Sequence, residues 1–417
     1  MKIYKSILCL LLCVLCLTLS CCQSDSKSLT ADYIRSEAIP VYDFFSGESV
    51  TPAGYEEFSA AYLDFAANLL KASSADESVA LSPLSLYTAL SMTANGASGK
   101  TLRELERLLG SDLSISEINT FIHYLSQRVE ILNNENGKVK SANSLWIDDS
   151  YSVKAQYLQT VVNYFDSEVF RDELSSEEIN NWIEENTEGL IKDMLSELDE
   201  DTAMVLVNAL LFDDEWLTPY EEEDIYDGSF KGTKGQQVVS FMESNEMLLT
   251  AADAKGFIKS YKNTPCKLVA ILPNEDVDID TYVSTLSGAK LTTLLNSAAG
   301  VNRCVAHLPE FELRTKLNLK DTISEMGAPL AFSDEANFEN LTMSENLKIS
   351  QVIQESFVDV SSKGTVAGSS SAVVVAPSAS ASPESDFESL VFDRPFVFMI
   401  VENECNLPLF IGTVKSI

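Results

Sequence analysis

Hydrophobic positions near the start of the folded part of the chain recur with the period of a helix. From Glu56 onward, Phe58, Tyr62, Phe65 and Leu69 follow one another at intervals of three or four residues. This spacing places them on one face of an amphipathic helix. We therefore expect the domain to open with a helix that packs against a core.

Helix start signals continue this pattern through the first half of the chain. Ser82-Pro83 has the form of an N-cap followed by proline at the first helical position. Thr101 with Glu104 and Ser175 with Glu178 have the spacing of capping boxes. These signals predict three further helices.

After residue 200 the pattern changes to that of strands. Ala203–Phe212 is an apolar run interrupted only by Asn208, which is typical of a strand buried on both faces. Further strand candidates are Lys267–Leu272, Arg303–Leu313, Leu347–Val360, Phe396–Val401 and Leu409–Val414. Helices that come first and sheets that dominate later indicate an α+β fold.

Residues 1–22 have the pattern of an export signal. Lys2 and Lys5 precede the apolar run Ile7–Leu19, which is too short for a comfortable membrane span. The following Cys21 and Cys22 make the segment resemble a bacterial lipobox, with Cys22 as the acylated residue. Cys21 is the alternative acylation site, and an ordinary secretory signal with incidental cysteines is the other interpretation. We expect an exported protein that is anchored by lipid at the cell surface or secreted.

The rest of the chain divides into two parts. Residues 23–55 are polar, with scattered proline and glycine and no sustained period, and they predict a flexible tether. Residues 56–417 are expected to form the folded domain, in which no internal repeat is visible.

Composition and charge narrow the function further. Hydrophobic residues make up 45% of the 417 residues and charged residues 22%, a globular composition. The net charge of −34 argues against nucleic-acid binding, which needs Lys and Arg to neutralise phosphates. It equally disfavours anionic lipid, so membrane contact is expected only through an N-terminal lipid anchor.

Side chains suited to catalysis or metal binding are scarce. His123 and His307 are the two histidines, and neither has the sequence setting of a catalytic triad. The cysteines beyond the export signal are Cys266, Cys304 and Cys405, without metal-type spacing and odd in number. We therefore expect no enzyme, no metal, no cofactor and no disulfide framework.

One segment does not have the pattern of a packed domain. Between Lys363 and Phe387 the residues are almost all Ser, Ala, Val, Gly and Pro. Composition alone predicts a flexible linker. Because the segment lies between two strong strand candidates near the C-terminus, a functional exposed loop is the better interpretation.

Several blocks, in order along about 360 residues, resemble those of the serpin family. They are Leu81-Ser82-Pro83-Leu84-Ser85, Gly96-Ala97-Ser98-Gly99-Lys100-Thr101, Ser141-Ala142-Asn143-Ser144-Leu145-Trp146, Ile179-Asn180-Asn181-Trp182, Val205-Leu206-Val207-Asn208-Ala209 with Trp216, Leu308-Pro309-Glu310-Phe311 and Asp393-Arg394-Pro395-Phe396. The resemblance implies a serpin fold of three β-sheets and about nine helices with an exposed reactive-centre loop. It also implies a monomeric suicide inhibitor of serine proteases, which traps the acyl-enzyme when the cleaved loop inserts into the central sheet as a new strand.

The residues of the loop can be compared with this requirement. The hinge that would enter the sheet first is Gly364, Thr365, Val366, Ala367, Gly368, Ser369, Ser370, Ser371 and Ala372. Alternate residues of a strand face the core, and those beginning with Thr365 are small or β-branched, without charge or proline. This pattern favours insertion, and therefore inhibition.

The usual loop length places the scissile bond at Ser378-Ala379. The bait residues Val375, Ala376 and Pro377 precede it and resemble a substrate of elastase-like or subtilisin-like proteases. Val375-Ala376 is the alternative bond. No basic residue lies in the bait, so a trypsin-like target is not expected.

The resemblance also assigns a region where the central sheet opens, and it shows departures from the family. Ser82, Ser85, Asn208, Trp216 and Gln354 are assigned to this region, with Gln354 where a histidine is often found. Two hinge positions that are usually acidic are occupied here by Ser362 and Val366. A non-inhibitory serpin that serves as a binding or storage protein is therefore the alternative function, and an unrelated exported hydrolase or carbohydrate-binding lipoprotein is a more distant one.

Overall fold

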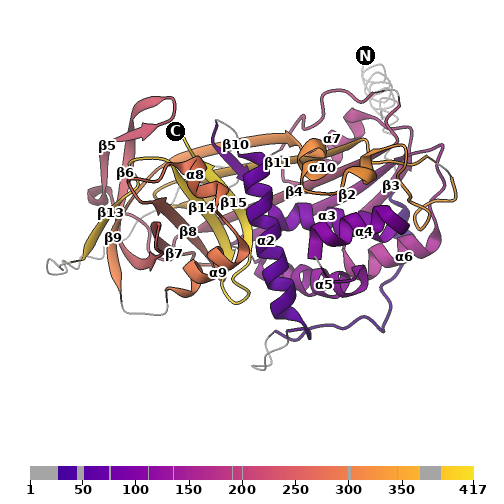
Figure 1. The fold of residues 1–417 in the computed structure, drawn as a ribbon, viewed down its shortest axis with the longest axis horizontal. Coiled ribbons are helices and arrows are strands. Elements are labelled where there is room, and N and C mark those ends of the chain that lie inside the picture. The colour runs from indigo at the N-terminus through magenta and orange to yellow at the C-terminus, as the bar shows by residue number, and fades with distance from the viewer. Residues whose placement is uncertain are drawn as a thin grey trace, which may run out of the picture.

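The structure is a computed structural model that describes most of the chain. The described ranges are 27–44, 51–74, 77–110, 112–134, 136–189, 191–199, 201–298, 302–344, 346–366 and 387–417. The expected export signal at 1–22 and the tract 367–386 lie outside these ranges. Figure 1 shows the arrangement of the elements.

The described residues contain nine α-helices and three short 3₁₀ helices. The α-helices are α2 (Tyr55–Ser73), α3 (Pro83–Gly96), α4 (Gly99–Gly110), α5 (Ile115–Leu132), α6 (Ala155–Tyr164), α7 (Ser176–Asn186), α8 (Ile279–Ser284), α9 (Gly288–Asn296) and α10 (Lys320–Glu325). The 3₁₀ helices are η1 (Leu29–Asp32), η2 (Glu222–Asp224) and η3 (Pro329–Phe332). A search of the described helices for one long and apolar enough to cross a membrane finds none.

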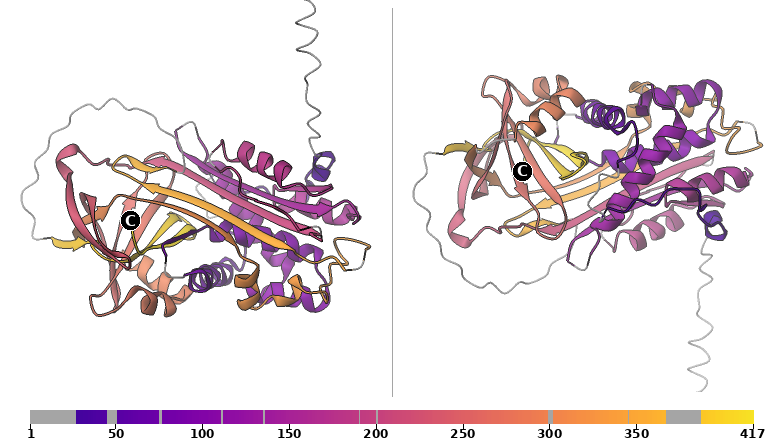
Figure 2. Two further views of the ribbon diagram at one scale, coloured as in Figure 1. Left: turned by 90° about the horizontal axis from the view of Figure 1, so that it is seen from above. Right: turned by 90° about the horizontal axis from the view of Figure 1, so that it is seen from below.

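The central sheet has six strands in the order β10-β11-β12-β4-β2-β3. Its strands are β2 (Lys138–Asp148), β3 (Glu168–Asp172), β4 (Met204–Glu215), β10 (Phe311–Asn318), β11 (Gln351–Val360) and β12 (Gly364–Val366). Figure 2 shows its long strands running through much of the length of the molecule.

The other sheet has nine strands, in the order β1-β15-β14-β8-β7-β6-β9-β13 with β5 paired to β6. They are β1 (Val79–Leu81), β5 (Ile225–Gly232), β6 (Gly235–Thr250), β7 (Ala254–Ser260), β8 (Cys266–Pro273), β9 (Arg303–Pro309), β13 (Glu388–Val391), β14 (Phe396–Glu402) and β15 (Pro408–Val414). The long β6 pairs with β5 and β9 over part of its length and with β7 near its end, so it joins two of the three expected sheets.

The apolar run of β4 is explained by cover on both faces. Leu206 and Leu210 belong to the main hydrophobic cluster beneath the sheet, whereas Val205, Val207 and Ala209 belong to a second cluster that includes Ile179 and Ile183 of α7. Because side chains alternate along a strand, the apolar residues of the run are covered on both faces. The sequence prediction for β4 is confirmed.

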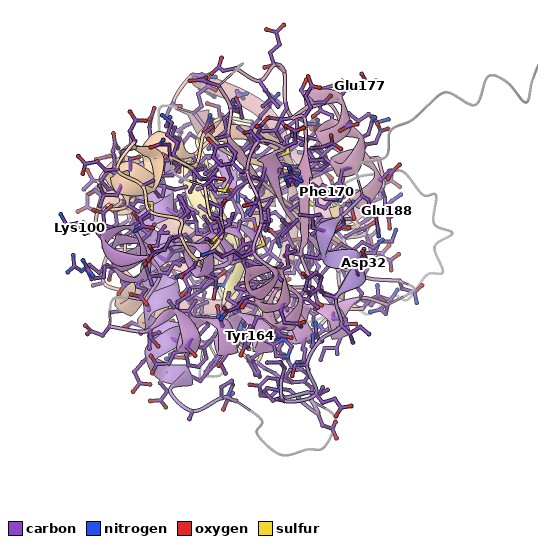
Figure 3. All side chains as sticks on the ribbon, turned by 90° about the vertical axis from the view of Figure 1, so that its right-hand side faces the viewer. Asp32, Lys100, Tyr164, Phe170, Glu177 and Glu188 are labelled. Atoms are coloured by element: carbon purple, nitrogen blue, oxygen red, sulfur yellow. The ribbon has the colours of Figure 1, made fainter. Side chains whose placement is uncertain are left out.

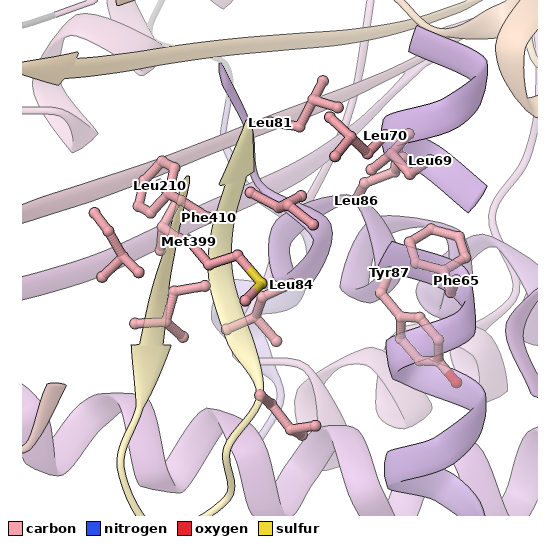
Figure 4. Close-up of a cluster of buried hydrophobic side chains, with 14 of the residues drawn as sticks. Phe65, Leu69, Leu70, Leu81, Leu84, Leu86, Tyr87, Leu210, Met399 and Phe410 are labelled. Carbon is pink, nitrogen blue, oxygen red and sulfur yellow. The ribbon is translucent and has the colours of Figure 1, made fainter. Parts of the chain in front are cut away.

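The main core forms where α2 and α3 pack on β1, β14 and β15. Figure 4 shows Phe65 and Leu69 of α2 close to Tyr87 of α3, with Phe410 of β15 and Met399 of β14 nearby. The Phe65 and Tyr87 rings meet edge to face with their centroids 5.1 Å apart, a favourable aromatic arrangement. The helical spacing from Phe58 to Leu69 therefore marks a genuine core face.

Two local predictions were wrong. Thr101 and Glu104 do not cap α4, which begins at Gly99; their side chains instead accept hydrogen bonds from the backbone amides of Asn337 and Leu330. Arg303–Leu313 is two strands, β9 and β10, that belong to different sheets. The chain passes from one sheet to the other between Pro309 and Phe311, a change of direction that hydrophobic alternation alone does not reveal.

Residues 27–44, part of the expected flexible tether, form a packed strap. Figure 3 shows the end of the molecule that carries the start of this strap, with Asp32 of η1 and Tyr164 of α6 labelled. The Tyr42 amide donates to Gln127 Oε1 over 2.9 Å, and the Ser36 amide donates to Asn163 Oδ1 over 3.0 Å. This segment is folded because α5 and α6 supply partners for its backbone, which its polar composition did not reveal.

Candidate functional site

The hinge of the predicted loop lies within the central sheet. β12 pairs antiparallel with β11 on one side and with β4 on the other. Farther along, β4 and β11 pair directly with each other in parallel, from Val205 to Ala209 on β4. β12 is therefore a short strand at one end of a seam that the direct pairing of β4 with β11 closes farther along.

The fit at the start of β12 requires very small residues. A Cβ atom added to Gly364 would lie 2.2 Å from the carbonyl oxygen of Asp214, so no larger residue fits here without moving the backbone. The next residue, Thr365, is 1% exposed, and Tyr261 Oη donates a hydrogen bond to its Oγ1 over 2.6 Å. Burial raises the pKa of the Tyr261 hydroxyl, so it remains a protonated donor.

Carboxylates flank the last residue of β12. The register places Val366 opposite Asp213 of β4 and Asp359 of β11. Burial is the main cause that raises the pKa of both carboxyl groups.

At the other hinge position that was expected to be acidic, a carboxylate is supplied by the connection between two other strands. Ser362 stands where the resemblance predicts an acidic residue, and its backbone amide donates to Glu310 Oε1 over 3.0 Å. Glu310 lies in the Leu308–Phe311 block, between β9 and β10. A carboxylate is thus present at this contact, but it comes from a different element.

Gln354 closes the seam between β4 and β11. Its Nε2 donates to the Ser82 carbonyl oxygen over 2.8 Å and to Asn208 Oδ1 over 3.0 Å, and its Oε1 accepts from the Ser82 amide over 3.2 Å. All three residues are buried. The Ser85 amide donates to Ser82 Oγ over 3.3 Å, which caps α3 at the same place. The structure brings together four of the five residues assigned to the opening of the sheet.

Trp216, the fifth residue, lies elsewhere. Its Nε1 donates to the Ser361 carbonyl oxygen over 2.8 Å, and its amide donates to the Lys363 carbonyl oxygen over 3.0 Å. Its ring stacks on Tyr261 with the centroids 4.6 Å apart. Trp216 therefore belongs to the hinge, at the end of β4, and lies apart from the group around Gln354.

The remaining predicted site residues lie outside the described ranges. These are the hinge residues Ala367, Gly368, Ser369, Ser370, Ser371 and Ala372, the bait residues Val375, Ala376 and Pro377, the bond Ser378-Ala379, and Cys21 and Cys22. Within the part of the chain that is described, no group of three His, Cys, Asp or Glu side chains could hold a metal ion. Cys266, Cys304 and Cys405 are buried free thiols.

Tyr261 and Glu310 at the hinge were not singled out from the sequence. Tyr261 lies 104 residues before Thr365, and Glu310 lies 52 residues before Ser362. Neither contact leaves a periodic or spacing signal in the sequence. The one clue was that Glu310 falls within a block that resembles the family.

Comparison with known proteins decides the family. The family model described as Serpin (serine protease inhibitor) matches residues 60–417. The chain belongs to the serpin family. Serpins are in general inhibitors of serine proteases rather than catalysts, and serine proteases are their usual partners.

Individual relatives support this assignment. Human Serpin B4 is 27% identical over 372 residues, covering 82% of this chain and 94% of that protein. The native crystal structure of the thermophilic serpin tengpin is 33% identical and covers 94% of this chain and 100% of its own, with a TM-score of 0.85. Its latent state covers 89% and 99% with a TM-score of 0.75. The present fold is thus more similar to the native than to the latent state.

A structure of human thyroxine-binding globulin shares the fold. It is 24% identical, covers 87% of this chain and 99% of its own, and has a TM-score of 0.74. The serpin fold therefore occurs also in a protein whose structure was solved in complex with thyroxine.

Proposed function

We propose that this serpin is a suicide inhibitor of elastase-like or subtilisin-like serine proteases. The observation that carries the proposal is the hinge: β12 is already a strand between β11 and β4, built from the small residues Gly364 and Thr365. After cleavage, the loop would extend this strand along the seam. Sheet pairing on both sides would satisfy its backbone groups.

The seam is suited to receive a strand without charge. Apart from the acidic residues at its mouth, the side chains along β4 that face the core are apolar except for Asn208, which lies between the buried Leu206 and Leu210. The hinge sequence carries no charge from Gly364 to Ala372. Burying an unpaired charge costs several kcal/mol, so this composition supports insertion.

The residues of the bait suggest which proteases would cleave the loop. Val375-Ala376-Pro377-Ser378 offers small residues to the protease and places Ser378-Ala379 at the scissile position, with Val375-Ala376 as the alternative. Mass spectrometry of the fragments after treatment with an elastase identifies the bond. Cleavage outside residues 375–379 would contradict the assignment.

The test of inhibition is incubation with an elastase followed by denaturing electrophoresis. We expect a covalent complex that survives denaturant, because the acyl bond is retained. The variant Thr365→Arg would introduce a charge at a position that is 1% exposed, and should be cleaved with little complex formed. Lys363→Arg, at an exposed position two residues earlier, is the matched control and should behave as the natural chain.

The same experiment separates the alternative function. If the natural chain is cleaved at the bait but forms no complex with elastase-like or subtilisin-like enzymes, inhibition by trapping is wrong. A non-inhibitory role as a binding or storage protein would then be favoured.

We also infer export and an N-terminal lipid anchor, at Cys22 or Cys21. The described strap begins at Lys27, and η1 lies against β3 and α6, at the end of the molecule opposite to β5, β9 and β13 (Figures 1 and 2). An anchor there would direct the loop-bearing end away from the membrane. Mass spectrometry of the N-terminal peptide tests for acylation, in the natural chain and in the variants Cys22→Ala and Cys21→Ala. An unmodified mature N-terminus in the natural chain would contradict the anchor.

A further inference from the structure

The turn that leads into the loop hinge is held by three consecutive carbonyl groups. Ser361 and Lys363 accept the two hydrogen bonds from Trp216 described above. Between them, the Ser362 carbonyl oxygen accepts from the Tyr220 amide over 3.1 Å. The segment from Trp216 to Tyr220 therefore fixes the turn that delivers β12 to the seam.

A buried lysine lies behind both aromatic rings of this segment. Lys259 Nζ of β7 is 4.1 Å from the ring centroid of Tyr220 and 5.6 Å from that of Trp216. Both distances are within the range of cation–π attraction, which is strongest where the cation is desolvated. The Lys259 side chain is only 3% exposed. The ammonium thus joins the two residues that hold the turn.

The carboxylate partner of the ammonium is Glu246, which is also largely buried. Lys259 Nζ lies 2.8 Å from Glu246 Oε1 of β6, whose side chain is 14% exposed. Ser244 Oγ lies 2.8 Å from the same oxygen and 3.3 Å from Tyr220 Oη, so the carboxylate and the tyrosine share a small polar network. Burial lowers the pKa of Lys259, and Glu246 acts in the opposite direction.

A buried ion pair is a costly way to fill a core. Replacing such a pair by apolar residues of similar volume is often neutral or stabilising. Stability therefore gives no reason for a lysine at this position, whereas two of its contacts, Trp216 and Tyr220, hold the turn before the hinge. Nothing in the sequence indicated this role, since β7 carries a second lysine, Lys255, that is only half-buried.

We propose that Lys259 is a positioning residue for the loop hinge. Its ammonium holds Trp216 and Tyr220 in place, and their hydrogen-bond donors hold the turn 361–363 so that β12 stays inserted between β4 and β11. Only the consequence of this role rests on the proposed function. After cleavage, insertion of the loop would start from a hinge that already lies in the sheet. The contact itself can be tested without a protease.

The test is amide hydrogen exchange of residues 361–366 in Lys259→Met, which keeps the length of the side chain and removes its charge. Loss of the contact should increase exchange of this segment about tenfold, the factor that corresponds to about 1.4 kcal/mol. Lys415→Met is the matched control. Lys415 is also a buried lysine paired with an acid, Asp280, but it lies on the C-terminal strand region away from the hinge, and its loss should leave 361–366 unchanged.

A second variant guards against a general loss of structure. Tyr220→Leu removes the ring but keeps the Tyr220 amide and the Lys259–Glu246 pair, and it should also increase exchange at 361–366. Exchange of the core strand β14 serves as the internal standard and should stay constant. In the double variant the two effects should not add, because both remove the same contact.

Unchanged exchange of 361–366 in Lys259→Met, or an equal increase in Lys415→Met, would overturn the proposal. With an elastase, Lys259→Met should consume several-fold more serpin for each protease trapped, because insertion begins later. If exchange responds as expected but the natural chain traps no protease, Lys259 still positions the hinge and the proposed inhibitory function is the one that fails.

Discussion

At the residue scale, one side-chain amide holds the two halves of the seam together. Gln354 uses both of its polar atoms, bonding to the backbone of Ser82 at the start of α3 and to Asn208 on β4. A strand can enter only if the bond to Asn208 breaks. The side chain that closes the sheet must therefore be able to exchange partners, which an amide with a donor and an acceptor can do.

Removing this amide should weaken the closed sheet. Gln354→Leu leaves the buried Ser82 amide without its partner, at a cost of about 1–3 kcal/mol, whereas the Ser82 carbonyl oxygen keeps its hydrogen bond from the Leu86 amide. The thermal midpoint, measured at a fixed scan rate because unfolding of such proteins is often irreversible, should fall. Gln351→Leu, at a half-buried position of the same strand, is the control and should have a much smaller effect. Equal midpoints for the two variants would contradict the role of Gln354.

The register of β12 predicts which loop residue reaches Gln354. Thr365 lies opposite Asp214 and Val360, and moving six residues along each strand brings Ser371 opposite Asn208 and Gln354. Thr365 is buried, so Ser371, an even number of residues away, should face the core as well. Ser371→Glu should then be cleaved with little complex formed, whereas Ser370→Glu should retain most of the inhibition. Denaturing electrophoresis with an elastase checks this, and the opposite order would show that the extrapolated register is wrong.

At the element scale, local signals predicted some elements and missed others for physical reasons. Ser82-Pro83 and Ser175 are N-caps as predicted, because a cap involves only neighbouring residues. The strands β5, β6 and β7 were missed because they are half exposed and carry polar residues, so no apolar run marks them. The group around Gln354 could be assembled in advance only through resemblance, since its members lie up to 272 residues apart in sequence.

The stability of the strap is expected to depend on pH. His123 of α5 contacts the strap, since its Nε2 lies 2.9 Å from the Pro40 carbonyl oxygen. Burial is the main cause that lowers the pKa of His123 from 6.5. The packed strap thus disfavours the charged ring, so its stabilisation is complete above about pH 6.5 and is lost as the pH falls through the lowered value. Amide exchange of residues 36–44, corrected for intrinsic rates, should increase at pH 5.5 relative to pH 7.5.

The two histidines provide the control for this prediction. The pKa of His307 is also lowered by burial, but His307 lies on β9, bonded to Tyr226 and Ser389 away from the strap. His123→Gln keeps a donor for Pro40 and should abolish the pH dependence at 36–44, whereas His307→Gln should leave it intact. A pH dependence that survives in His123→Gln would assign it to another group.

At the scale of the whole molecule, the described fold leaves the central sheet short of a strand. β4 and β11 pair in parallel only from Val205 to Ala209 and from Gln351 to Glu355, while β12 occupies three residues at one end. A full-length strand between them would form antiparallel ladders on both sides, like those that β12 forms. The sequence could indicate this property only through its uncharged hinge, because an unfilled position in a sheet is a property of the assembled strands.

Cleavage of the loop should therefore make the protein more stable. About ten new backbone hydrogen bonds at about 1 kcal/mol each should raise the thermal midpoint by at least about 10 °C in a domain of this size. Calorimetry of the natural chain before and after treatment with an elastase measures the change, and cleaved Thr365→Arg should show much less of it, because its hinge cannot be buried. An unchanged midpoint after cleavage of the natural chain would mean that the loop does not insert. The stored energy on which trapping depends would then be missing, and the binding or storage role would become the better explanation of this fold.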